Sequence, residues 1–155
     1  MFIATEELRS AIYDYQLNEI VENDSDIVLI AINTAVEEMK SYLTPNNQSR
    51  CRDGRPRYDC IAIFEAEGSA RNALIVELCK SIAVWYICRL SNVDVIHDQV
   101  KERYDRAIEW LEKVAGVGKY AGAPAISPNL PVIAEDPDNP FIPLRSGSRD
   151  KFTHE

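Results

Sequence analysis

Apolar side chains recur at helical spacing along several stretches of the chain, and residues 93–115 are the most regular of them. Steps of three and four residues place these side chains on one face of a helix, as in the seam of a bundle. The opposite face alternates acidic and basic side chains, which is typical of a solvated surface. We therefore predict a helix here, with Ser91 and Asn92 as its turn and cap and Asp94 in its first turn. Its apolar face consists of Val93, Ile96, Val100, Tyr104, Ala107, Leu111 and Val114.

Residues 72–90 form the longest apolar stretch, and their apolar positions cover almost the full circumference of a helix. Other elements must enclose such a helix, so we predict that it is the central helix of the fold. Glu77 and Lys80 interrupt the stretch and Arg89 lies at its end, whereas a membrane span needs about 20 uninterrupted apolar residues. A membrane span is therefore not expected.

Two further helical regions are predicted before the central helix. Residues 1–20 carry a small apolar stripe, with Thr5 at an N-cap position and acidic residues in the turn that follows. Within them, residues 15–20 (YQLNEI) are predicted to form a second short turn. The polar cluster at residues 22–26 stops this region and caps the next helix. That helix shows its apolar period from Ile27 onward and ends at Pro45.

Residues 44–66 break this rhythm, because their first part has no apolar period and contains proline and glycine. We predict a surface excursion. Its four arginines have Asp53 and Asp59 beside them, which favours a solvated loop over a phosphate site. We assign them as candidate contacts to a partner: Arg50, Arg52, Arg55 and Arg57. Residues 58–64 fit either a short extended segment or the beginning of the next helix, and the pattern leaves both open.

The chain after residue 118 is of a different kind. Gly116 and Gly118 end the last helix, and six of the eight prolines follow, so residues 118–155 are predicted to form an extended, irregular arm. The arm keeps apolar side chains that a disordered tail has little reason to carry. They are Leu130, Val132, Ile133, Phe141, Ile142 and Leu144. We hypothesise that residues 120–152 dock on a neighbouring subunit or an adjacent ring. Phe141, Ile142 and Leu144 would anchor the arm, and Arg145, Arg149 and Lys151 would pair with acidic residues.

These elements together predict an all-α protein. We expect a small helical bundle of about four to five helices around the central helix 72–90, followed by the irregular arm. The bundle domain comprises residues 1–117, with the surface excursion at 44–66, and the arm comprises residues 118–155.

Composition and charge limit the possible functions. With 155 residues, 46% of them hydrophobic and 27% charged, the chain is typical of one soluble domain. Its net charge is −8, and residues 1–43 alone carry nine acids against two bases. Such an acidic half argues against a module that grips DNA, because phosphate binding needs clustered Lys or Arg. The first ten residues lack the pattern of a secretory signal, so we expect a cytoplasmic protein.

Candidate chemistry is sparse. Cys79 and Cys88 are nine positions apart on one predicted helix and so point to opposite faces, which prevents a shared metal ion or disulfide. Cys51 and Cys60 flank a loop, and whether they pair is left open. The Gly118–Lys119 pair lacks the spacing of a phosphate loop, and no nucleophile is placed to use His97. We predict no catalytic residue, no metal site and no cofactor.

Four strings together resemble a known family: FIATEEL, VLIAINTAVEEMKSYL, ARNALIVELCKSIAVWYICRL and VKERYDRAIEWLEKVAGV. In this order they look like the Mu-type phage and prophage proteins assigned to the neck, or head–tail connector. The likeness covers most of residues 2–117, and KERYDRAIEWL is its most specific part. The end, PFIPLRSGSRDKF, is similar to the C-terminal arms of Bacteroidetes prophage members. The excursion at 44–66 and the long arm depart from the compact family pattern.

The resemblance implies a helical structural protein of the virion, assembled in the cytoplasm of a bacterial host. Such a protein self-associates into a ring below the portal and contacts portal and tail-completion proteins. DNA passes through the lumen without specific binding, and an acidic surface suits such a conduit. The alternative is a bacterial helical module that binds or regulates another protein and is unrelated to virions. Portal, capsid and tail genes beside its gene would favour the connector.

Overall fold

The computed structural model describes residues 2–22, 24–44, 51–52, 56–91, 98–120, 126–134 and 142–143. The fold is all-α, as predicted. Its helices are α1 (Asp14–Val21), α2 (Ser25–Leu43), α3 (Cys60–Phe64), α4 (Ala73–Leu90) and α5 (Asp98–Ala115). Of the 3-10 turns, η1 (Thr5–Ser10) precedes α1, η3 (Gly68–Ala70) lies between α3 and α4, and η4 (Gly118–Tyr120) follows α5. Two residues each form β1 (Cys51–Arg52) and β2 (Ile142–Pro143), which pair in parallel.

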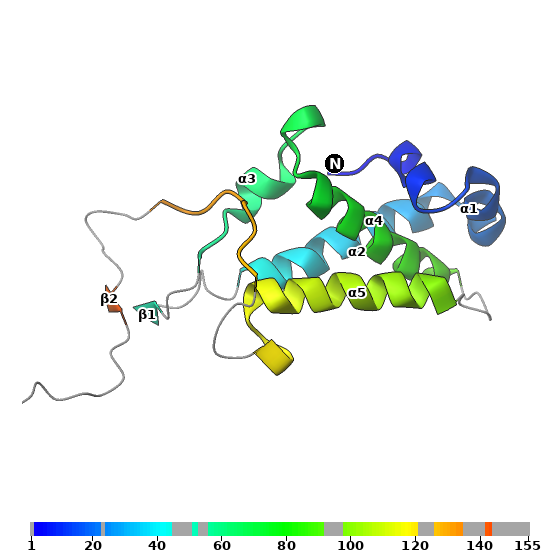
Figure 1. Cartoon of the computed structure of the whole chain (residues 1–155). Coiled ribbons are helices and arrows are strands. Elements are labelled where there is room, and N and C mark those ends of the chain that lie inside the picture. Colours follow the sequence, from blue (N-terminus) through cyan, green and yellow to red (C-terminus); the bar gives the residue numbers. More distant parts are fainter. Residues whose placement is uncertain are drawn as a thin grey trace, which may run out of the picture.

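Helices α2, α4 and α5 pack against one another, with α4 crossing α2 at an oblique angle, α1 at one end of the bundle and α3 toward the other (Figure 1). The central role predicted for residues 72–90 is confirmed, because α4 packs against both α2 and α5. Ile75, Ile82 and Ile87 of α4 are fully buried, as are Ile32 of α2 and Leu111 of α5. None of the helices in the described ranges combines the length and the hydropathy that crossing a membrane requires.

Polar side chains begin the long helices where the sequence indicates. Asp24 Oδ1 accepts a hydrogen bond from Asp26 N at the start of α2, and Asn72 Oδ1 accepts from the amides of Leu74 and Ile75 at the start of α4. Each cap satisfies amide groups that have no partner inside the helix. The prediction that residues 22–26 stop one element and cap the next is therefore confirmed.

The N-terminal prediction needs a correction. The second short turn predicted at residues 15–20 lies within α1, but the first element is the 3-10 turn η1, and Ala4 occupies the N-cap position that the sequence pattern assigns to Thr5. The cap is made from inside the turn, because Glu7 Oε2 accepts the Ala4 amide at 2.9 Å. A carboxylate three residues ahead thus replaces the expected hydroxyl.

Helix α5 buries the face that its pattern predicts, because Ala107, Leu111 and Val114 are at most 1% exposed. Its described part begins at Asp98, and the predicted start at residues 93–97 lies outside the described ranges. The helix ends as expected at Gly116, whose φ of 64° lies in the left-handed region that glycine adopts without strain.

Residues 56–66 are not a surface excursion. Tyr58, Ile63 and Phe64 are all buried in the core, at 2%, 4% and 7% exposure. Both interpretations of residues 58–64 are correct, each for a different part of the segment. Tyr58 is extended and pairs with Val132 in an antiparallel bridge, and α3 begins at Cys60. The described remainder of the excursion is β1, at residues 51–52.

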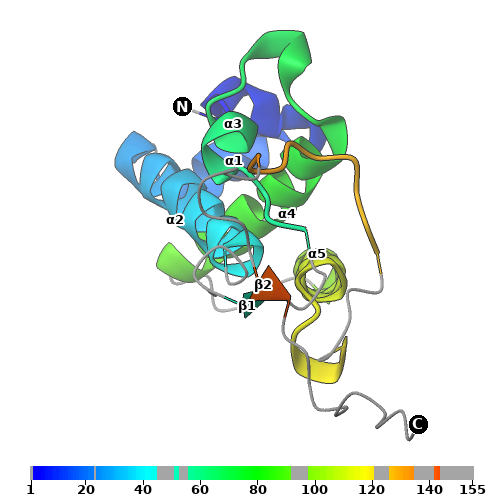
Figure 2. The same cartoon turned by 90° about the vertical axis from the view of Figure 1, so that its left-hand side faces the viewer.

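The first part of the predicted arm packs on its own bundle. Leu130 is 7% exposed and belongs to the core, and Ile126 packs against it. The Ile133 amide donates to Arg57 O at 2.7 Å, and the Asp59 amide donates to Pro131 O at 2.9 Å. Figure 1 shows this segment in orange beside the residues that lead into α3, and Figure 2 shows the same arrangement after a turn of 90°. Residues 126–134, which we call the strap, therefore belong to the bundle domain.

Candidate functional site

The residues proposed from sequence as partner contacts fall mostly outside the described ranges. Those outside are Arg50, Arg55, Phe141, Leu144, Arg145, Arg149 and Lys151. Ile142 and Arg52 lie in the short ladder, where Cys51 is opposite Ile142 and Arg52 is opposite Pro143. Arg57 is half-buried and holds the strap through its carbonyl oxygen. The structure thus brings one end of the arginine loop and one part of the arm together through their backbones.

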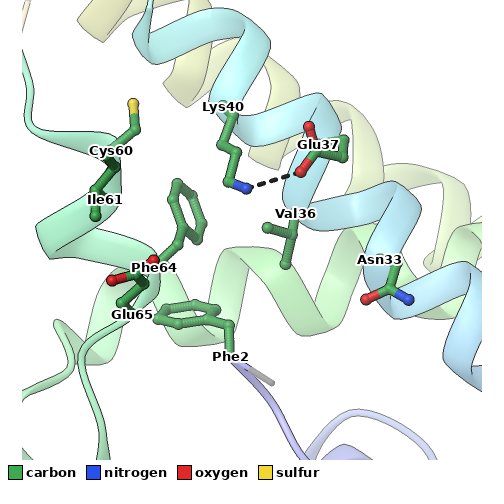
Figure 3. A pocket seen from close by; sticks show the side chains of 9 residues that line it. All are labelled: Phe2, Asn33, Val36, Glu37, Lys40, Cys60, Ile61, Phe64 and Glu65. Carbon is green, nitrogen blue, oxygen red and sulfur yellow. Dashed lines mark hydrogen bonds and ion pairs between the residues drawn. The ribbon is translucent and has the colours of Figure 1, made fainter.

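A pocket of about 400 Å³ lies between α2, α3 and the start of the chain. Its floor is formed by Phe2, Val36 and Phe64, as Figure 3 shows. The rings of Phe2 and Phe64 meet edge to face, with centroids 5.0 Å apart. Ile61 lines the opening and is 69% exposed. An exposed isoleucine beside two buried aromatic rings is typical of a surface that binds an apolar group.

Charged side chains form the rim of this pocket. Lys40 donates to Glu37 Oε1 at 2.7 Å, and its ammonium lies 5.8 Å from the centroid of the Phe64 ring. Glu37 and Glu65 are both exposed at the opening. Two carboxylates against one ammonium leave the rim net negative. The pocket is therefore suited to an apolar side chain carried by a cationic segment.

Local contacts hold the pocket walls in place. At the start of α3, Asp59 Oδ1 accepts the Ala62 amide at 3.0 Å, which caps this short helix. On the other wall, Arg71 Nη1 donates to Phe2 O at 2.8 Å and so fixes the first described residue. The same guanidinium binds the Glu7 carboxylate at 2.9 and 2.6 Å and lowers the pKa of Glu7 to about 2. Each wall is therefore held by a hydrogen bond between a side chain and a backbone group.

A larger groove of about 980 Å³ lies between α1, the end of α4 and the start of α5. Arg9 and Arg103 line it together with Glu19, Glu22 and Asp98, so charges of both signs are mixed there. Arg103 already donates to Ala11 O at 3.1 Å, and Arg9 pairs with Asp14 at 3.0 Å. This groove shows less preference for one kind of partner than the pocket at α3.

Adjacent acids on α2 point in different directions, as their spacing predicts. Glu37 lines the pocket, whereas Glu38 accepts a hydrogen bond from Tyr104 Oη at 2.9 Å across the bundle. Burial, followed by the hydrogen bond and negative charge of Glu38, raises the pKa of Tyr104 far above its usual value. The phenol stays protonated at neutral pH and serves as a donor between two helices. The contact between Tyr104 and Glu38 is therefore a structural hydrogen bond, and Glu37 and Glu38 do not form a dyad that shares a proton.

The helix cysteines are small core side chains. Cys79 and Cys88 are buried free thiols, and burial raises the pKa of Cys79 to about 12. Cys60 is a half-buried free thiol at the pocket, and burial raises its pKa as well. A thiol with a raised pKa is a poor nucleophile at neutral pH. In the described part of the chain, no group of three His, Cys, Asp or Glu side chains is placed to hold a metal ion.

Sequence reasoning did not identify the pocket, because its residues come from three separated segments. Only Phe2 and Val36 stand in apolar patterns, and the pattern over α3 is ambiguous.

Lys80 interrupts the apolar run in the sequence, yet it is 7% exposed and donates hydrogen bonds to Ser10 Oγ at 3.0 Å and to Glu77 Oε1 at 2.7 Å. The Glu77 three residues before it is the one local signal for this burial.

Comparisons with protein-family models, with curated proteins and with solved structures found no match to this chain. A proposal for its function therefore rests on the residues described above and on the resemblance of its helices.

Proposed function

We propose that the protein is a structural subunit of a tailed phage or prophage virion, a head–tail connector that forms a ring below the portal. The observation that carries the proposal is the string KERYDRAIEWL at residues 101–111, which belongs to α5. Within it, Ala107 and Leu111 are buried against the other helices, while Lys101, Glu102 and Arg106 are exposed. The string thus combines a packing face with a charged outer face.

The order and type of the elements support the same proposal. The resemblance implies a helical body, and α2, α4 and α5 form one. A ring also requires unlike surfaces on its two sides, because each copy contacts a different neighbour through each of them. The pocket at α3 and the chain that continues beyond the strap offer two such surfaces.

Electron microscopy of the purified protein, alone and mixed with the portal protein of the same genome, tests the proposal. We expect rings, or rings seated on the portal. A protein that stays monomeric and does not bind the portal would overturn the connector assignment. Portal, capsid and tail genes beside the gene would support it independently.

The competing proposal is a bacterial helical module that binds another protein. The pocket at α3 favours this alternative, because an apolar floor with an exposed isoleucine beside it suits the binding of a peptide from another protein. Gene neighbours with no relation to virions, together with a monomeric protein in solution, would select this alternative.

A further inference from the structure

We propose that the pocket between α2 and α3 of one copy receives the C-terminal segment, residues 144–152, of a second copy. Phe152 would occupy the apolar floor, and Arg145, Arg149 and Lys151 would face the acidic rim. This inference rests on the proposed function, because it names the contact by which neighbouring subunits of a ring would join.

The floor of the pocket supplies the first argument. The rings of Phe2 and Phe64 lie edge to face, with their centroids 5.0 Å apart. The ring of Phe152 would extend this arrangement by a third aromatic side chain. At about 400 Å³ the pocket lies near the lower end of the volumes of about 300–1,000 Å³ that ligand sites occupy. It has room for one or two side chains of an extended segment and not for a folded element.

Charge complementarity supplies the second argument. Glu37 and Glu65 carry two negative charges at the opening, and the single ammonium of Lys40 is already bound to Glu37. Residues 144–152 carry three bases and one acid, Asp150. The residues that line the opening therefore leave an acidic rim for a basic segment to meet. Paired opposite charges also steer the two surfaces together.

Chain length supplies the third argument. Strand β2 ends at Pro143, and its ladder with β1 ties that point of the arm to its own copy. Residues 144–152 span at most about 30 Å when fully extended, at about 3.3 Å per residue. This reach is sufficient to join the ladder of one copy to the pocket of a second copy packed beside it. The pocket on one copy and the segment on the next would then form the unlike surfaces that a head-to-tail contact needs.

Cross-linking between two copies tests the proposal on the full chain. Ile61→Cys places an exposed thiol at the opening of the pocket, and Cys60→Ser removes the half-buried thiol beside it. Thr153→Cys places a second thiol beside Phe152 without removing the anchor. Cys51→Ser removes the thiol of β1. Chains of this variant, one half labelled with ¹⁵N, are mixed, treated with a short bis-maleimide and digested. We expect linked peptides that join the thiol at position 61 of one isotope form to the thiol at position 153 of the other.

Matched variants make the result specific. Adding Phe152→Ser should reduce the mixed-isotope product at least tenfold, because it removes the anchor and leaves the thiol. Glu37→Lys with Glu65→Lys should reduce it similarly, and adding Arg145→Glu with Arg149→Glu should restore part of it. The pocket substitutions are at exposed positions, so an unchanged circular dichroism spectrum and melting temperature confirm that the fold is intact.

The outcomes separate this inference from the proposed function. Linkage only within one chain would overturn the assignment to a second copy. Absence of any product that joins position 61 to position 153 would overturn the pocket as the receptor. Rings that form in either case leave the connector function standing and place their contacts elsewhere. Mixed linkage in a protein that does not bind its portal would support this contact and reject the connector function.

Discussion

Arg71 and Glu7 join the start of the chain to the residues before α4 through two hydrogen bonds of 2.9 and 2.6 Å. Their side chains are 18% and 32% exposed, and Arg71 also binds the carbonyl oxygen of Phe2. One guanidinium therefore fixes both the 3-10 turn η1 and a wall of the pocket at α3.

Glu7→Gln should lower the free energy of unfolding by about 1–2 kcal/mol, because hydrogen bonds to charged groups contribute about 1.5–3 kcal/mol and solvent screens part of this pair. Urea denaturation at pH 7 measures the loss. Glu6→Gln is the matched control, because Glu6 is the neighbouring acid in the same turn. An equal effect of both substitutions would contradict the assigned role of the ion pair.

The same pair predicts a pH dependence. The pKa of Glu7 is lowered from 4.5 to about 2, so the folded protein binds its proton less readily than the unfolded chain does. The stability from this group is fully present above about pH 4.5 and is lost as the pH falls from there toward 2. The difference in unfolding free energy between wild type and Glu7→Gln should therefore shrink over this interval. A difference that stays constant down to about pH 2.5 would be inconsistent with the ion pair.

Replacing Lys80 should lower the unfolding free energy less than removing its partner Glu77. Lys80→Met keeps the length of the buried stem and removes the charge, so its unfolding free energy should stay within about 1 kcal/mol of wild type. Glu77→Ala leaves the ammonium with Ser10 alone and should cost about 1–2 kcal/mol, since Glu77 is 57% exposed and water replaces part of the interaction. Thermal unfolding of both variants gives the order. The reverse order would show that the ammonium itself stabilises the fold.

Tyr104→Phe should cost about 1–2 kcal/mol, because it removes the hydrogen bond to Glu38 and leaves a carboxylate oxygen inside the bundle. Tyr15→Phe is the control, because Tyr15 is 66% exposed.

The pKa of Tyr104 is raised above 10, so the folded state holds this proton more tightly than the unfolded chain. Its stabilising effect is complete below about pH 10 and is lost as the pH rises toward the raised pKa. In an ultraviolet titration of the phenolate absorbance, fewer phenols should ionise near pH 10 in the folded wild type than after unfolding, because burial also raises the pKa of Tyr42, Tyr58 and Tyr86. Tyr104→Phe should remove one phenol from the group that ionises above that pH.

The strap should stabilise the bundle on which it packs. Leu130→Ala should cost about 2 kcal/mol, the lower end for a buried leucine, because the site lies at the edge of the core. A chain ending at Ala134 should keep the stability of the full protein within about 0.5 kcal/mol. A chain ending at Gly118 should be less stable than both. Equal melting temperatures for the two shortened chains would show that the strap contributes nothing.

The long helices were predictable because their signals are local. Apolar steps of three and four residues after the polar cluster at 22–26 predict α2, and the apolar stretch at residues 72–90 predicts α4, each without reference to the rest of the chain. The pocket and the strap were not predictable in this way. The Tyr58–Val132 bridge and the Arg71–Glu7 pair join residues that are far apart in sequence, and no period along the chain marks them. Proline content predicted that residues 126–134 are irregular, yet irregular backbone also packs wherever a neighbouring segment supplies hydrogen bonds.

The hydrogen bonds of Pro131 and Ile133 to the backbone of residues 57–59 have a geometric consequence for assembly. In every copy the remainder of the chain starts from one fixed place on the bundle, so its contour length limits it to a sphere centred on that place. A receptor inside the sphere meets the chain end at a high effective concentration, and a receptor outside it never does. Lengthening or shortening residues 144–151, which follow the ladder of β1 and β2, would rescale that sphere without altering any contact in the described part of the bundle.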